Sequence, residues 1–170
     1  PTGVRMDLPR RQALLQWARE HDAWVVEDDY DGEFQYGSAA QRVPALCSLP
    51  GSERVLYVGT FSRTLHPGLR LGFVVVPPAL VDAFAMARAI TDRQAPGDAQ
   101  AVLARFIDEG HLLRHLRRMR ELYVERQQVL REALADASDG AVRLLPSDRG
   151  MHLLHEDVAG SDDEALSGLA

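Results

Sequence analysis

Residues 55–76 constrain the fold of this chain more than any other stretch. An apolar run at 55–58 predicts a strand, and a second run at 69–76 predicts another strand after a turn at Pro67 and Gly68. Hydroxyl residues and an arginine gather between the two runs. Thr60 and Ser62 offer hydrogen bonds, and Arg70 offers a charged planar fork for a dianion. The stretch therefore predicts a phosphate site just past the end of a strand.

An acidic segment follows a second predicted strand. The apolar run 23–26 predicts a strand buried on both faces, and it leads into the acidic segment 27–34. Such a segment could hold a metal ion, but capping and surface charge are the interpretation that we prefer for Asp29, Asp31 and Glu33. Two buried strands joined by a loop after a helix predict an open α/β sheet, in which ligands bind at the carboxyl ends of strands. We therefore expect Asp28 and Thr60 to lie at one site.

The rest of the sequence predicts helices and two further strands. Apolar spacing predicts a helix that begins after Asp7 and ends at His21, with Arg10 and Arg11 on a solvated face. Further helices are predicted at 79–90, 99–109 and 111–137. Short strands are predicted at 141–145 and 150–155, before a polar, weakly helical end at 161–170.

Residues 59–72 resemble the cofactor-lysine segment of fold-type I pyridoxal 5′-phosphate (PLP) enzymes. The resemblance is strongest to the aminotransferase-like domain of MocR-type regulators of the GntR family, which reads Gly-Thr-Phe-Ser-Lys-Thr-Leu-x-Pro-x-Leu-Arg-Leu-Gly. This chain has Arg63 where the family has the lysine that forms the Schiff base. The segments 27–34 and 110–120 resemble the same family, in the same order and at fitting distances. The resemblance thus covers the chain from residue 1 to about residue 155.

The resemblance implies an α/β fold, as part of the large domain of a fold-type I, aspartate-aminotransferase-like transferase with the start of the small C-terminal domain. Residues 1–110 would belong to the PLP-binding large domain, and residues 111–170 to a long connecting helix and the beginning of the small domain. It further implies an amine or amino-acid effector, a homodimer in the intact parent, and DNA contact only through a missing N-terminal domain.

The resemblance also implies roles for five residues. Asp28 would pair with the protonated pyridine nitrogen of PLP and keep the ring an electron sink, and Tyr30 would hydrogen-bond the ring hydroxyl. Thr60, Ser62 and Arg70 complete the cofactor-binding set.

Arg63 cannot take the role of the lysine at its position. A guanidinium stays protonated in proteins and is a poor nucleophile, so PLP would be held non-covalently if it binds at all. The side chain should turn towards the cofactor phosphate or a carboxylate, with Asp28 as a candidate partner. Three hypotheses follow: an effector-sensing regulator domain, a class I/II aminotransferase enzyme, or a truncated or decayed copy without PLP chemistry. Transamination needs the lysine to hold PLP and to shuttle a proton, so enzymatic turnover is the hypothesis that Arg63 disfavours.

Composition and net charge argue against several other classes of protein. The net charge of −6 gives no sign of nucleic-acid binding by this segment, and all nineteen basic residues are arginine, with no lysine. The single Cys47 excludes an internal disulfide and suits a reducing cytoplasm, and no apolar run approaches a membrane span. His111 and His115 have helical chelating spacing but lack a third ligand, so we expect no metal site.

Overall fold

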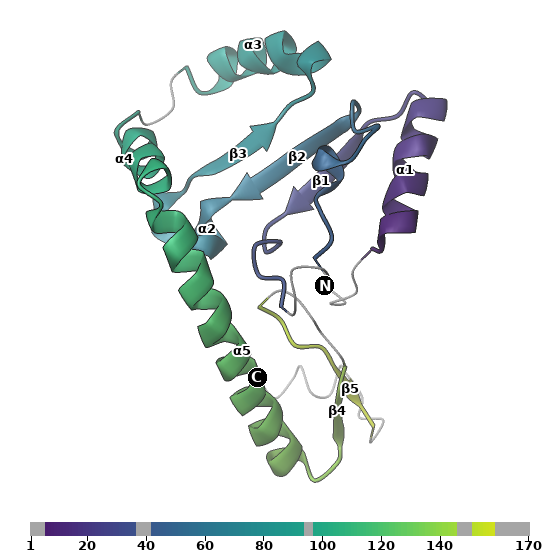
Figure 1. Ribbon diagram of the computed structural model, residues 1–170, viewed down its shortest axis with the longest axis vertical. Coiled ribbons are helices and arrows are strands. Elements are labelled where there is room, and N and C mark those ends of the chain that lie inside the picture. Colours follow the sequence, from purple (N-terminus) through teal and green to yellow (C-terminus); the bar gives the residue numbers. More distant parts are fainter. Residues whose placement is uncertain (1–5, 37–41, 94–96, 146–150, 159–170) are drawn as a thin grey trace.

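The computed structural model describes residues 6–36, 42–93, 97–145 and 151–158. A three-stranded sheet lies among the helices, and a two-stranded hairpin lies apart from it, beside the far half of the longest helix (Figure 1). The predicted strand residue Gly150 and the segment 161–170 lie outside the described residues.

Helix α1 (Leu8–Glu20) begins as predicted. The Asp7 side chain accepts a hydrogen bond from the backbone nitrogen of Arg10 at 2.9 Å, which satisfies one of the free donors of the first turn. Leu15 of this helix forms the buried core with Leu46, in the short helix η2 (Leu46–Ser48), and with Val55. Helix α1 therefore covers one face of the sheet.

The three predicted strands form one sheet, which confirms the expected α/β arrangement. They are β1 (Val25–Asp29), β2 (Val55–Thr60) and β3 (Gly72–Val75), in that order, with β1 and β2 parallel and β2 and β3 antiparallel. The prediction that the first strand is buried on both faces is wrong. Val26 is 63% exposed, because in the described residues the core around Leu15 covers only the opposite face of β1.

The strand predicted at 69–76 is shorter than expected. Its first residues belong to the short helix η3 (Pro67–Leu69), and Arg70 then adopts a left-handed conformation, with φ 51° and ψ 31°. Strand β3 starts only at Gly72, where the backbone pairs with Thr60. The turn is therefore wider than the sequence pattern indicated.

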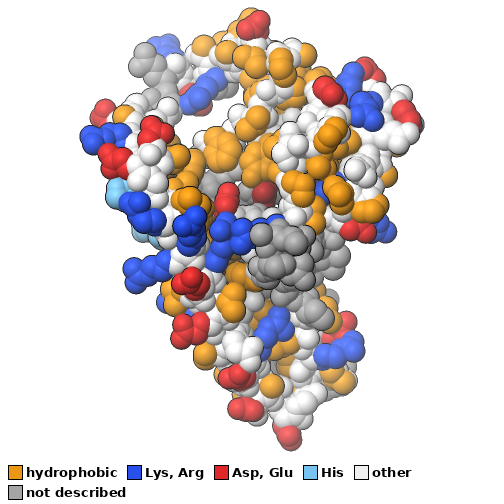
Figure 2. All heavy atoms as spheres, viewed as in Figure 1, with side chains coloured by type: hydrophobic (Ala, Val, Ile, Leu, Met, Phe, Trp, Pro, Cys, Tyr) orange, Lys and Arg blue, Asp and Glu red, His pale blue; other side chains and the backbone are white. Residues whose placement is uncertain are grey.

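Helices follow β3 close to the predicted positions. They are η4 (Pro78–Leu80), α3 (Val81–Thr91), α4 (Gly97–Asp108) and α5 (His111–Ser138). Gly110 separates α4 from α5 with a φ of 73°, a left-handed conformation that suits glycine at a helix end. Helix α3 exposes large apolar side chains, among them Met86 and Ile90, and apolar atoms gather at the top of the view in Figure 2, where α3 lies.

The hairpin at the end of α5 differs from the prediction at its second strand. Strand β4 (Val142–Leu144) lies where expected, but β5 is formed by His155–Asp157, so it begins at the last residue of the predicted strand 150–155. The antiparallel register joins Leu144 to His155. Across the described residues, no helix has both the length and the apolar character needed to cross a bilayer.

Candidate functional site

The ends of β1 and β2 bring two predicted site residues to one face of the sheet. Asp28 is paired in register with Val58, and Thr60 lies two residues further along β2. Because side chains alternate along a strand and register partners share a face, the Asp28 and Thr60 side chains point to the same face. Asp28 is exposed and Thr60 is half-buried. The two strand ends are therefore adjacent, as expected, and the binding site at these ends stays a prediction.

A single helical turn, α2 (Phe61–Thr64), directs the residues that follow Thr60. The Thr60 hydroxyl oxygen accepts a hydrogen bond from the backbone nitrogen of Ser62 at 3.1 Å, which caps the turn. Phe61 and Thr64 line a cavity on the far face of the sheet. Since successive helical residues are about 100° apart, the Ser62 and Arg63 side chains project away from that cavity. Arg63 is exposed there.

The charged residues of the predicted site have no partner inside the described part of the chain. Asp28, Arg63 and Arg70 are all exposed, and none makes a side-chain hydrogen bond or ion pair there. The ion pair that we considered between Arg63 and Asp28 is therefore not formed. One carboxylate and two guanidiniums remain free to bind a ligand.

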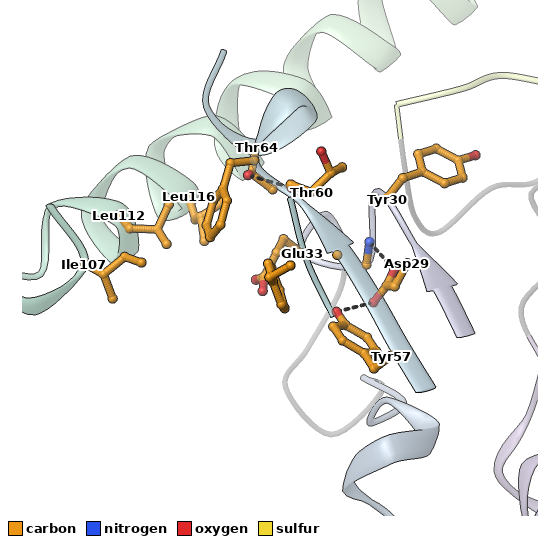
Figure 3. A pocket seen from close by; sticks show the side chains of 13 residues that line it. Asp29, Tyr30, Glu33, Tyr57, Thr60, Thr64, Ile107, Leu112 and Leu116 are labelled. Carbon is orange, nitrogen blue, oxygen red and sulfur yellow. Dashed lines mark hydrogen bonds between the residues drawn. The ribbon is translucent and has the colours of Figure 1, made fainter. Parts of the chain in front are cut away.

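Tyr30 lines the same cavity as Phe61 and Thr64. It is half-buried, follows the end of β1, and packs edge-on against His152 with ring centroids 6.0 Å apart. The sequence did not predict this contact, because 122 residues separate the two rings. In Figure 3 the Tyr30 ring and the Thr60 side chain point away from Tyr57.

A cavity of about 190 Å³ lies on the face of the sheet opposite Asp28. Its walls combine the sheet residues Tyr57 and Phe73 with side chains from α4 and α5, including Leu112 and Leu116 (Figure 3). The sequence analysis did not find this cavity, although two of its predicted site residues, Tyr30 and Thr60, contribute to the lining. The apolar stripe of α5 was a further signal, but it does not reveal which surface the stripe faces.

A hydrogen bond from Tyr57 fixes one wall of the cavity. The Tyr57 hydroxyl donates to Oδ2 of Asp29 at 2.9 Å, and Asp29 Oδ1 accepts from the backbone nitrogen of Gly32 at 2.7 Å. Burial, followed by the charge of Asp29, raises the pKa of Tyr57 above its ordinary value. Asp29 thus has the local capping role that we preferred for it.

Two other charged residues differ from the sequence interpretation. Arg11 was predicted to be solvated, but it is buried and pairs with Glu27 at 2.7 Å. Asp31 was interpreted as surface charge or a cap, yet it is only 5% exposed. The surface interpretation failed for both residues because the local sequence does not show whether a charged side chain is buried. For Arg11 the partner that permits burial is Glu27, sixteen residues away.

Helix α5 holds the segments that follow both β1 and β2. His115 Nε2 donates to the backbone oxygen of Thr64 at 2.9 Å, next to Arg63. Further along the helix, Arg120 Nε donates to the backbone oxygen of Glu33 at 2.6 Å, and Arg120 Nη2 lies 3.1 Å from the Glu33 carboxylate. These contacts tie one long helix to both strand-end segments.

An aromatic contact strengthens the attachment of α5 to the segment after β1. Tyr123 packs edge-on against the fully buried ring of Phe34, with ring centroids 5.0 Å apart. His111, the other histidine with helical chelating spacing, contacts Glu109.

Comparison with known proteins gives a consistent result. The family model for aminotransferase class I and II matches residues 1–167. The chain is 44% identical to a probable rhizopine catabolism regulatory protein MocR of Rhizobium meliloti, over 98% of this chain and 33% of that protein. The chain spans about a third of the length of these curated relatives.

Solved structures show the same fold. A multiple substrate aminotransferase from Thermococcus profundus aligns with a TM-score of 0.87 and 30% identity, over 99% of this chain and 41% of the other. The α-aminoadipate aminotransferase LysN of Thermus thermophilus, solved with N-(5′-phosphopyridoxyl)-L-leucine, aligns with a TM-score of 0.84 and 34% identity, over 98% of this chain and 43% of the other. The chain therefore has the fold of part of a fold-type I aminotransferase.

Proposed function

The chain belongs to the aminotransferase class I and II family, and from this premise we propose that it is the effector-sensing part of a MocR-type transcription regulator. The similarity to the MocR protein of Rhizobium meliloti supports this choice, as does 38% identity to an HTH-type transcriptional regulator of Bacillus subtilis. In the longer protein, DNA would be contacted by a separate domain, the protein would be a homodimer, and an amine or amino acid would be the effector.

The residues at the strand ends fit PLP as a non-covalent ligand. Asp28 lies on the same face as Thr60 and has no partner within the described residues, so its carboxylate is available to a protonated ring nitrogen. Tyr30 would donate to or accept from the ring hydroxyl. Thr60, Ser62 and the unpaired Arg70 would hold the phosphate by hydrogen bonds and charge. When bound, PLP supplies an aldehyde and an electron-withdrawing ring.

Arg63 is the observation that carries this proposal. It stands at the position of the family's lysine, and a delocalised guanidinium is a poor nucleophile. The chain therefore offers no amine there to form a covalent carbon–nitrogen bond with the aldehyde or to move a proton to and from a substrate. A sensor needs only to bind PLP, whereas an aminotransferase must also convert its substrate.

The contacts of α5 support a sensing role. A ligand that moves the segment after β1 or the segment after β2 also acts on α5, through Arg120 in the first case and His115 in the second. The other end of α5 packs against β4, where Arg131 reaches the backbone oxygen of Leu145. Helix α5 could thus transmit occupancy of the site towards the β4–β5 hairpin.

Borohydride reduction tests the role assigned to Arg63. When the protein is mixed with PLP, we expect the absorption spectrum of the free aldehyde and no cofactor attached at residue 63 after reduction. The Arg63→Lys variant should gain a reducible link at that position, detected by peptide mass spectrometry. Arg126→Lys, at an exposed position on α5, is the matched control and should gain none there.

Two results would contradict the proposal. Cofactor trapped at residue 63 of the unmodified protein would show that no lysine is needed there. Failure of both the unmodified protein and Arg63→Lys to bind PLP would favour a decayed copy without PLP chemistry.

A further inference from the structure

Arg63 adds a positive charge near the strand ends, and none of the cofactor-binding roles proposed above uses it. If Asp28 serves a protonated ring nitrogen and Thr60, Ser62 and Arg70 hold the phosphate, Arg63 stands where the family's lysine would meet the aldehyde carbon, and a bare phosphopyridine has no anionic group at that carbon. Arg63 is nevertheless exposed, on the side of α2 opposite the cavity-lining residues Phe61 and Thr64. Its charge is therefore available to a further anionic group on a ligand.

The acids near the strand ends do not neutralise Arg63. Glu27 is paired with Arg11, Asp29 accepts the Tyr57 hydroxyl, and Glu33 is paired with Arg120. Asp28 shares the site but makes no ion pair with Arg63. The structure thus leaves this guanidinium without an internal counter-charge within the described residues.

We infer that Arg63 selects phosphopyridoxyl compounds that carry a carboxylate, such as conjugates with an amino acid, over those that carry only an amine. This inference rests on the proposed function and names the ligand class of that site. The guanidinium fork matches a carboxylate with two parallel hydrogen bonds, which neither a neutral amine nor an alkyl group can accept. Arg63 then recognises the group that is attached to the cofactor, whereas the family's lysine forms a covalent bond with the cofactor.

A matched pair of ligands isolates the carboxylate. N-(5′-phosphopyridoxyl)-L-leucine and N-(5′-phosphopyridoxyl)-3-methylbutylamine share the phosphate, the ring and the branched side chain, and they differ only in the carboxylate. Isothermal titration calorimetry with both ligands should be performed on the protein, on Arg63→Gln and on Arg126→Gln as the control. Because Arg63 is exposed, the substitution should leave the fold intact, which circular dichroism verifies.

We expect the leucine conjugate to bind at least about tenfold more tightly than the amine conjugate, the range of a charge-assisted hydrogen bond. This preference should be lost in Arg63→Gln and retained in Arg126→Gln. Equal affinities in the unmodified protein would overturn the inference and leave the proposed function standing. A preference that persists in Arg63→Gln would overturn it too, since another residue would then bind the carboxylate. If neither ligand binds, the proposed function itself fails.

Discussion

Replacing Arg11 by methionine should destabilise the protein strongly, because the change leaves a buried carboxylate without its charge partner. The side chains of Arg11 and Glu27 are each 11% exposed, and their charged atoms lie 2.7 Å apart. Arg11 also donates to the backbone oxygen of Met6 at 3.1 Å, and Glu27 accepts from the backbone nitrogen of Leu46 at 2.8 Å. After Arg11→Met, the Leu46 amide is the one hydrogen-bond donor left to the Glu27 carboxylate among the residues that the structure describes.

Removing one partner of a buried pair costs about 3–5 kcal/mol, against about 5–15 kcal/mol for the unfolding of a typical domain. With an m-value of about 2 kcal/mol per molar urea, the unfolding midpoint should fall by about 2 M. The assay is urea unfolding followed by circular dichroism. The ion pair of Arg11 and Glu27 also matters for the candidate site. Glu27 adjoins Asp28 in β1, so the pair fixes the end of that strand.

Two further variants test the reasoning. Arg105→Met breaks the pair of Arg105 and Glu109, whose side chains are 83% and 49% exposed, and it should cost at most about 1 kcal/mol. Adding Glu27→Gln to Arg11→Met removes the unpaired charge and should recover about 1–2 kcal/mol. Equal losses for Arg11→Met and Arg105→Met, or no recovery in the double variant, would refute the buried-charge explanation.

Two other predictions concern the surroundings of the site. Burial, with the neighbouring Tyr123 and Asp31, raises the pKa of Tyr36 to about 12 from an ordinary value of about 10, so the neutral phenol is favoured in the folded state. The contribution of Tyr36 to the free energy of unfolding should be complete below about pH 10 and should fall as the pH rises to about 12. Unfolding measured across this range should show a smaller fall in the Tyr36→Phe variant. An unchanged pH dependence of the unfolding free energy in that variant would contradict the assignment. His115→Ala removes the hydrogen bond to the Thr64 backbone oxygen, and amide hydrogen exchange at residues 61–64 should become faster, whereas His111→Ala should leave it unchanged.

The sequence predicted the elements that local pattern determines. The apolar runs before Asp28 and Thr60 indicated adjacent strands, because buried strands in such folds are continuous apolar runs that end where ligands bind. The cap at Asp7 was also correct, since N-cap chemistry depends on the next three residues alone. Positions 28 and 60 could therefore be assigned to one edge of one sheet without the structure.

Interactions between distant segments could not be predicted in this way. Arg11 looked solvated because its helix is polar, and its burial depends on Glu27 of β1, sixteen residues further along the chain. The contacts of His115 and Arg120 with the strand-end segments join residues 51 and 87 positions apart. Local periodicity carries no information on such pairs, so the role of α5 in holding the site emerged from the structure alone.

The central claim, that these residues hold PLP without a covalent bond, is tested most directly by how bound cofactor leaves the protein. The protein should be equilibrated with PLP, freed of excess ligand by rapid gel filtration, treated with borohydride to make any imine permanent, and then passed through the same column in denaturant. We predict that cofactor travels with the folded protein and separates completely from the unfolded chain, and that Asp28→Ala weakens its retention. Cofactor that stays with the denatured chain, or that never travels with the folded protein, would contradict the account.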